Sequence, residues 1–295
     1  MSGKLSILYH AVAFVVVAIW GSTFVFTKLL LLGGLTPAQI FVLRFVIAYL
    51  MLLVFCLWRG IRWVSDSWKD ELLMVLLGLT GGSLYFLTEN SSMNYTTTTN
   101  TSLIVSLCPL VATALISLFY KSQRLNRRQT VGSLMAAVGV ALVVMNGHFV
   151  LHLSPLGDVL AFSAALYWAV YSLLMIPVNR KYDTLFITRK VFFYGLLTMI
   201  PYFIWRPGLG IHLLVQQPEL VWNLLFLGCV ASMLCFLAWN WVLKKLGAVV
   251  ATNYVYFNPV TTIIFAWLIL HEQITLFFIL GTLLILVGMY MADRH

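Results

Sequence analysis

The chain has 295 residues, of which 62% are hydrophobic and 9% are charged, and its mean hydropathy is +0.97. Because a soluble domain carries about 25% charged residues, this composition excludes a soluble fold and indicates a polytopic membrane protein. The net charge of +9 could suggest a nucleic-acid partner, but Lys and Arg gathered in cytoplasmic loops explain it better, so no nucleic acid is expected.

Apolar segments long enough to cross a bilayer as helices follow one another along the whole chain. A spanning helix needs about 20 apolar residues, and ten segments qualify. They run over about 8–32, 37–58, 71–89, 97–119, 127–146, 156–177, 184–205, 219–241, 247–270 and 273–292. The first segment lacks a small-residue cleavage site, so it is expected to remain as a span. The predicted fold is all-α, with ten transmembrane helices and no soluble domain.

The basic residues predict the orientation. If the N-terminus is inside, every predicted inner segment carries Lys or Arg, whereas the outer ends and loops carry only Lys28 and Arg206. This asymmetry predicts a multi-pass protein of the cell's inner (cytoplasmic) membrane with both termini inside. The cysteines lie in apolar runs without a histidine cluster, and no metal or cofactor is expected. They are Cys56, Cys108, Cys229 and Cys235.

The two halves of the chain match each other at an offset near 150 residues. Residues that are rare inside spans coincide in order, because Arg44 falls on Arg189, Asn90 on Asn240 and Pro109 on Pro259. The predicted repeats are residues 1–147 and 148–295, with five spans each. An odd number of spans inverts the second copy, and inverted repeats are typical of secondary transporters that bind their substrate where the halves meet.

Several segments also resemble a known family. They are "AIWGSTFVFTK" (18–28), "RFVIAYLMLL" (44–53), "YTTTTNTSLIVSLCPLVATALI" (95–116), "AALYWAVYSLLM" (164–175), "GAVVATNYVYFNPVTTIIFAWLILHEQIT" (247–275) and "GTLLILVGMYM" (281–291). Over nearly its whole length the chain resembles the drug/metabolite transporter superfamily, in its EamA branch. The resemblance implies two five-helix EamA-like repeats, alternating access to a central cavity, and export of metabolites such as amino acids or of toxic compounds. One departure is that Glu272 occupies the acidic position after the fourth span of the second repeat, whereas the first repeat has Ser122 there.

Charged residues inside spans are candidates for function, because each costs about 2.5–3.5 kcal/mol at a helix centre. Glu89 either binds a substrate amine or a proton, or is a solvated helix end. Arg44 and Arg189 either attract an anionic group or bond helix-end carbonyls in a structural or gating role.

Uncharged polar and aromatic groups complete the predicted site. Trp20, Tyr167, Trp168 and Tyr171 lie nearer mid-depth, and helix packing is the alternative role for them. The full set of predicted substrate-binding residues is Trp20, Ser22, Thr23, Glu89, Asn90, Asn100, Tyr167, Trp168, Tyr171, Asn240, Asn253, Tyr254 and Tyr256. The polar stretch 88–102 and its copy 238–253 are predicted to form two gates on opposite faces.

Two further features concern the helices themselves. Pro109 and Pro259 either mark helices that rock during transport or cause static kinks. Small residues in the fifth and tenth spans predict close helix packing. They are Gly132, Ala136, Gly139, Gly281 and Gly288.

The predicted function is secondary transport of small amphipathic metabolites, amino acids or drugs, by a monomer that is either proton-coupled or a facilitator. The alternative is transport of another solute class, such as a nucleotide-sugar, a cofactor or a lipid-like compound. A membrane channel or a membrane enzyme is a less favoured alternative. Four histidines at span ends or in loops form no catalytic set with a partner. They are His148, His152, His212 and His271.

Overall fold

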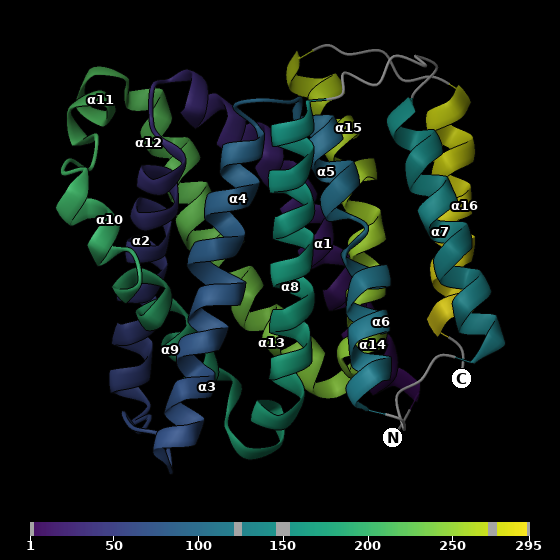
Figure 1. The fold of residues 1–295 in the computed structure, drawn as a ribbon, viewed down its shortest axis with the longest axis horizontal. Coiled ribbons are helices and arrows are strands. Elements are labelled where there is room, and N and C mark those ends of the chain that lie inside the picture. Colours follow the sequence, from purple (N-terminus) through teal and green to yellow (C-terminus); the bar gives the residue numbers. More distant parts are fainter. Residues whose placement is uncertain (1–2, 121–125, 146–153, 271–275, 294–295) are drawn as a thin grey trace.

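The computed structural model describes residues 3–120, 126–145, 154–270 and 276–293, and within these ranges every regular element is a helix (Figure 1). This confirms the all-α fold class. Ser122, Glu272, His148, His152 and His271 lie outside the described residues.

The first half of the chain folds into a series of helical elements. They are α1 (Gly3–Leu32), α2 (Pro37–Trp58), α3 (Trp68–Gly78), the π-helix η1 (Leu79–Ser83), α4 (Leu84–Ser92), α5 (Thr98–Val105), α6 (Cys108–Phe119) and α7 (Arg127–Met145). Of these, α3, η1 and α4 form one span, and α5 and α6 form another. The start of α2 illustrates how the sequence sets these bounds. Thr36 and Gln39 form a capping box, and Pro37 occupies the first turn, where its missing N–H has no intrahelical partner to lose.

The described residues of the second half also form only helical elements. Its elements are α8 (Pro155–Lys181), α9 (Thr184–Leu197), α10 (Ile200–Trp205), α11 (Ile211–Gln216), α12 (Pro218–Leu225), the π-helix η3 (Phe226–Leu234), α13 (Cys235–Leu246), α14 (Ala248–Asn253), the 3₁₀-helix η4 (Tyr254–Phe257), α15 (Asn258–Leu270) and α16 (Leu276–Asp293).

Seven helical segments among the described residues are long and apolar enough to cross a membrane. They are Ile7–Leu32, Pro37–Trp58, Trp68–Ser92, Thr98–Phe119, Pro155–Lys181, Pro218–Leu246 and Ala248–Ile269. The other three predicted spans correspond to α7, to α9 with α10, and to α16. The predicted span 184–205 is not continuous, because Pro201 lies in the first turn of α10 and the helix is interrupted at Thr198 and Met199.

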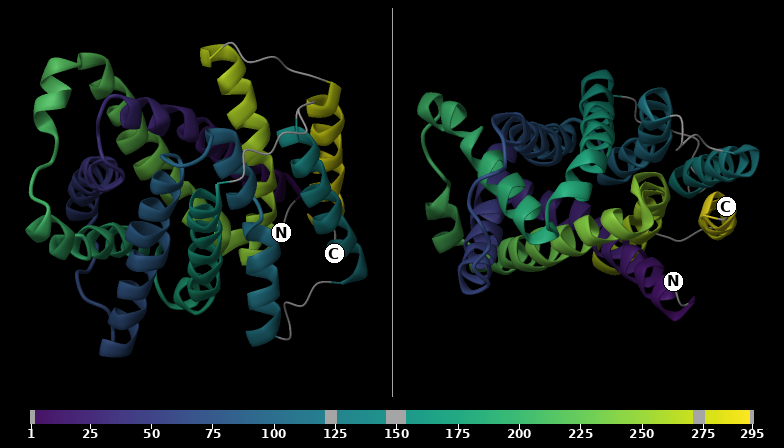
Figure 2. Two further views of the ribbon diagram at one scale, coloured as in Figure 1. Left: turned by 45° about the horizontal axis from the view of Figure 1, so that its top comes forward. Right: turned by 90° about the horizontal axis from the view of Figure 1, so that it is seen from below.

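Helices α7 and α16 lie side by side at one edge of the molecule (Figures 1 and 2). Their glycines let the backbones approach closely, since a Cβ added to Gly288 would lie 2.5 Å from the backbone N of Ala136 and 2.6 Å from the backbone O of Gly132. A Cβ added to Gly139 would lie 2.7 Å from the backbone O of Gly281. The small residues therefore meet as the sequence predicts.

The two halves also share irregularities of their helices. Gly78 ends α3 just before η1 and packs on α9, while Gly228 lies within η3 and packs on α2. In each half a broken helix follows. Pro109 is at the start of α6, after the break from α5, and Pro259 is at the start of α15, after η4. The prolines thus mark helix starts rather than kinks within a continuous helix.

Candidate functional site

A narrow cavity lies between α1, α2, α4, α5, α8, α13 and the η4–α15 break, so both halves of the chain contribute to it. The volume open to the centre of a water molecule is about 20 Å³, which is room for one or two waters. Its lining residues are Trp20, Thr23, Phe24, Arg44, Tyr85, Phe86, Glu89, Val105, Trp168, Phe236, Val255 and Asn258. A metabolite needs a wider cavity than this conformation provides.

Glu89 lies on this cavity and is 6% exposed. The hydroxyl of Tyr85, one helical turn earlier on α4, donates a 2.6 Å hydrogen bond to its carboxylate. Residues four apart share a helix face, so α4 presents the phenol and the carboxylate together. Of the two interpretations of Glu89, the solvated helix end is therefore wrong.

Arg44 lies on the same cavity and is 1% exposed. Its Nε donates to the hydroxyl of Ser232 in η3 at 2.8 Å, its guanidinium lies 4.5 Å from the ring centre of Phe86, and its Nη1 has no hydrogen-bond partner. Arg44 and Glu89 interact electrostatically, but no ion pair within 4.0 Å joins them in the described part of the chain. The cavity thus brings a basic and an acidic side chain together.

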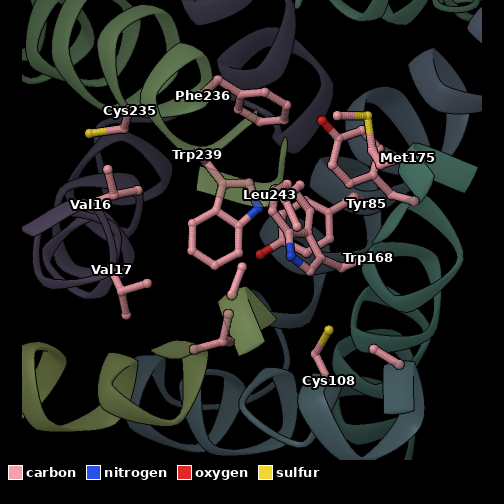
Figure 3. Close-up of a cluster of buried hydrophobic side chains, with 14 of the residues drawn as sticks. Val16, Val17, Tyr85, Cys108, Trp168, Met175, Cys235, Phe236, Trp239 and Leu243 are labelled. Carbon is pink, nitrogen blue, oxygen red and sulfur yellow. The ribbon is translucent and has the colours of Figure 1, made fainter. Parts of the chain in front are cut away.

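Aromatic rings form much of the remaining wall. The ring centres of Trp20 and Trp168 are 5.3 Å apart, and those of Tyr85 and Trp168 are 4.9 Å apart. Figure 3 shows Trp168 and Tyr85 beside Trp239, with Phe236 nearby. The indole N–H of Trp20 donates to the backbone oxygen of Ala231 at 2.9 Å, which fixes this ring across the two halves. The cavity is therefore charged or acidic at Arg44 and Glu89, polar at Thr23 and Asn258, and mostly aromatic elsewhere.

The sequence identified five of the lining residues, namely Trp20, Thr23, Arg44, Glu89 and Trp168. Most of the predicted amides instead join helices. The hydroxyl of Tyr171 donates to Asn240, whose Nδ2 donates to Thr188 at 2.9 Å.

The two predicted amides of the outer stretch behave in the same way. Asn90 donates to the backbone oxygen of Pro37 at 3.3 Å, and Asn100 donates to Thr96 at 2.9 Å and to Asp158 at 2.7 Å. Both asparagines are buried, so much of this polar stretch forms a helix–helix contact.

The other predicted residues also lie outside the cavity lining. Ser22 is buried and donates to the backbone oxygen of Ile19 in its own helix, and Tyr167 is half-buried. The hydroxyl of Tyr254 pairs with Nδ1 of His10 at 2.7 Å. Asn253 and Tyr256 are buried, and the side-chain amide of Asn253 has no hydrogen-bond partner.

Sequence reasoning missed seven lining residues. Two had a usable signal, since Tyr85 precedes Glu89 by one turn and Asn258 immediately precedes the proline that starts a helix. The other five are apolar residues with nothing to distinguish them from packing residues in the sequence. They are Phe24, Phe86, Val105, Phe236 and Val255.

Arg189, the repeat partner of Arg44, does not face the cavity. It donates to the backbone oxygens of Ile61 and Arg62 and packs 4.5 Å from the ring centre of Trp63. These contacts match the predicted bonding of an arginine to carbonyl groups. Arg189 therefore fastens the segment between α2 and α3 to α9.

Ion pairs reinforce this same end of the molecule. The carboxylate of Glu71 accepts from Lys190 and from Tyr194, and Lys181 pairs with Asp70. We call these five residues the ion-pair cluster.

A second pair lies just before α3, at the surface. The hydrogen bond from Arg62 lowers the pKa of Asp66 below its ordinary value, so Asp66 is ionised at neutral pH. Because both side chains are exposed, this pair contributes little to stability.

Comparisons with known proteins show what the chain is similar to. The sequence profile of the "EamA-like transporter family" matches twice, over residues 7–145 and 155–292. An "Uncharacterized transporter" of Archaeoglobus fulgidus is 29% identical over 97% of this chain and 98% of its own length. A "Probable amino-acid metabolite efflux pump" of Escherichia coli is 25% identical over 94% of this chain and 92% of its own length. A crystal structure with 19% identity superposes with a TM-score of 0.73, covering 96% of this chain and 95% of that chain, and shows the shared fold.

Proposed function

Since this chain is a multi-pass membrane protein that belongs to the EamA-like transporter family, we propose that it exports small amphipathic metabolites by alternating access through the Arg44–Glu89 cavity. The main support is that one buried cavity, lined by both halves of the chain, brings together Arg44, Glu89 and several aromatic rings. Ionisable groups inside membrane spans mark substrate or ion pathways. The position between repeats is also where secondary transporters bind substrate.

We propose ten spanning helices arranged as two inverted repeats, residues 1–147 and 148–295. Support comes from the paired irregularities: a glycine at a π-helical segment, a broken helix that restarts at a proline, and glycines where α7 meets α16. In Figure 1 α1 begins and α16 ends toward the same end of the molecule. We propose that this end faces the inside of the cell in the inner membrane, and the distribution of basic residues supports this orientation.

The proposed solute class is amino acids and related amphipathic compounds. The aromatic walls can pack against an apolar part of a solute, and the side chains of Arg44 and Glu89 can bind its ionic groups. The relative named an amino-acid metabolite efflux pump supports this class. Nucleotide-sugars, cofactors and lipid-like compounds are the alternatives that a solute screen separates.

Alternating access requires contacts at both ends that open in turn. At one end Asn100 bonds Asp158, and at the other the ion-pair cluster joins α3 to α8 and α9. We propose that these contacts open in turn while α5–α6 and α14–α15 move at their breaks. In this proposal the chain works as a monomer. If transport is coupled to protons, a pH gradient across the membrane should change the transport rate.

Transport is favoured over catalysis because relatives across the full length are named as transporters. The described residues also hold no group of three or more His, Cys, Asp or Glu side chains that could bind a metal ion.

A metabolite-efflux screen tests the proposal. Cells over-producing the chain are compared with cells producing a Trp168→Ala variant, and the medium is assayed for released solutes, amino acids first. Release of one or more amino acids that depends on Trp168 supports the proposal. Equal concentrations of released solutes in the media of both strains and of cells without the protein would contradict it.

A further inference from the structure

The cavity holds a buried basic and a buried acidic side chain that bind different neutral partners. Arg44 bonds Ser232 and Glu89 bonds Tyr85, although both charged side chains line one small space. Burying a charge is costly unless it is paired. Because no described ion pair satisfies either charge fully, each can still bind an ion of opposite sign.

The Arg44 guanidinium has donors to offer. It carries five N–H donors, of which the one on Nε is used by Ser232, while Nη1 is buried and has no partner. A carboxylate is the group that fits this planar fork best, because it can accept two parallel hydrogen bonds.

Glu89 offers the complementary acceptor. The Tyr85 hydroxyl occupies one position on Oε1, and a carboxylate has about four lone-pair sites in total. An ammonium group can therefore donate to Glu89 while Tyr85 keeps the carboxylate in place. The rings of Tyr85, Phe86 and Trp168, which also line the cavity, add attraction for a cation.

Between the two charges the wall is aromatic. Trp20 and Trp168 pack edge to face, with their planes at 90°, and the Phe236 ring centre lies 5.6 Å from that of Trp168. An apolar or aromatic body fits against these rings better than a polar one, because the ring faces cannot satisfy buried hydroxyl groups. The unpartnered Oδ1 of Asn258, elsewhere on the wall, can accept one further hydrogen bond.

We propose that the cavity recognises a zwitterion, with the solute carboxylate on Arg44, its ammonium on Glu89 and an apolar side chain against Trp20 and Trp168. This rests on the proposed function and assigns each end of the solute to a residue. The class is α-amino acids with apolar or aromatic side chains. A compound with the same side chain but only one of the two charges leaves Arg44 or Glu89 unpaired and is disfavoured.

The test compares three probes that share a phenyl ring: L-phenylalanine, phenethylamine as the cation and 3-phenylpropanoate as the anion. Purified protein in liposomes is assayed for uptake of each at neutral pH. Since a hydrogen bond to a charged group contributes about 1.5–3 kcal/mol, phenylalanine should be preferred about tenfold to a hundredfold over either analogue.

Variants then test which residue binds the carboxylate of the solute and which binds its ammonium group. Glu89→Gln should abolish the preference for phenylalanine over 3-phenylpropanoate, and Arg44→Gln the preference over phenethylamine. Glu219→Gln and Arg206→Gln make the same chemical changes at exposed positions and should keep the wild-type ratios. Ratios within one variant do not depend on how much protein folds.

A measurement on the wild type covers the case in which these variants fail to fold. Phenylalanine should raise the melting temperature more than either analogue, because at equal concentration the ligand with the lower Kd stabilises the folded state more. Equal uptake and equal stabilisation by all three probes would overturn the zwitterion proposal. So would unchanged ratios in folded Glu89→Gln and Arg44→Gln. If the efflux screen finds no exported solute at all, the proposed function itself fails.

Discussion

Arg44 and Arg189 are partners in the sequence repeat, yet they have different surroundings. Arg44 faces the cavity with an unpartnered nitrogen, whereas Arg189 bonds two backbone oxygens near the surface of the bundle. The difference arises because the segment between α2 and α3 comes back over α9, which places carbonyl groups within reach of Arg189. Equivalent residues can thus serve recognition in one copy and structure in the other.

Replacing Arg189 should therefore affect stability more than selectivity. Arg189→Gln removes charged hydrogen bonds to Ile61 and Arg62 and the contact with Trp63, so we expect a loss of about 1.5–3 kcal/mol. The melting temperature in detergent should fall while the preference among the three phenyl probes stays unchanged. A change of preference at normal stability would contradict the structural role.

For single residues, the sequence predicted the charged residues and some of the aromatic residues of the cavity. It also predicted several asparagines at the substrate that do not line the cavity. Glu89, Arg44 and Trp168 were identifiable because charge and mid-depth aromatics are unusual in spans. Asn90 and Asn240 were expected at the substrate, but a buried amide can equally bond a neighbouring helix. Which of these occurs depends on helix rotation, which a single sequence does not specify.

The close contact of α7 and α16 was predictable from the spacing of small residues, and it can be tested by filling it. Gly139→Leu introduces atoms where a Cβ would already lie 2.7 Å from the backbone O of Gly281. We expect a loss of about 1–3 kcal/mol from overpacking, measured as a lower melting temperature. Val138→Leu on the exposed face of the same helix should have no such effect, and equal melting of both variants would argue against the contact.

The broken helices test whether motion at the breaks matters. In Pro109→Ala the residue regains its N–H, which allows α5 and α6 to join as one helix. We expect stability to be kept or raised while the transport rate falls several-fold. Pro155→Ala, at the exposed first turn of α8, is the matched control and should transport normally. Normal transport by Pro109→Ala would show that the break is static.

The π-helical segments η1 and η3 and the interruption between α9 and α10 were not predicted. Hydropathy reports that a segment is apolar, but not whether its helix is continuous. A single Pro201 near the end of a predicted span was insufficient to place the break, because membrane helices tolerate proline when neighbouring groups satisfy the backbone.

For the whole molecule, hydropathy predicted the all-helical class and the resemblance of several segments predicted the family, which the family profile confirms. Seven of the predicted spans correspond to helices of full spanning length. The cavity itself was not predictable residue by residue. It forms where eight elements from both halves converge, and that convergence is a property of packing rather than of any local pattern.

Alternating access predicts that the two predicted gates, residues 88–102 with Asn100 and residues 238–253 with Asn253, open in turn. Single cysteines at Asn100 and at Asn253, in a chain whose four native cysteines are replaced, are treated with an impermeant thiol reagent. Because both positions are buried in this structure, added substrate should raise the reactivity of one and lower that of the other. A cysteine at exposed Tyr95 should react equally with and without substrate. Parallel changes at Asn100 and Asn253 would contradict the mechanism.

The central claim, that the chain is a carrier working through the Arg44–Glu89 cavity, is tested most directly by counterflow in liposomes. Vesicles loaded with unlabelled phenylalanine are diluted into a trace of labelled phenylalanine. A carrier that alternates should accumulate label transiently above equilibrium, and Glu89→Gln should abolish this overshoot while Glu219→Gln keeps it. Entry of label only to equilibrium, as through a channel, or an undiminished overshoot in Glu89→Gln would contradict the account.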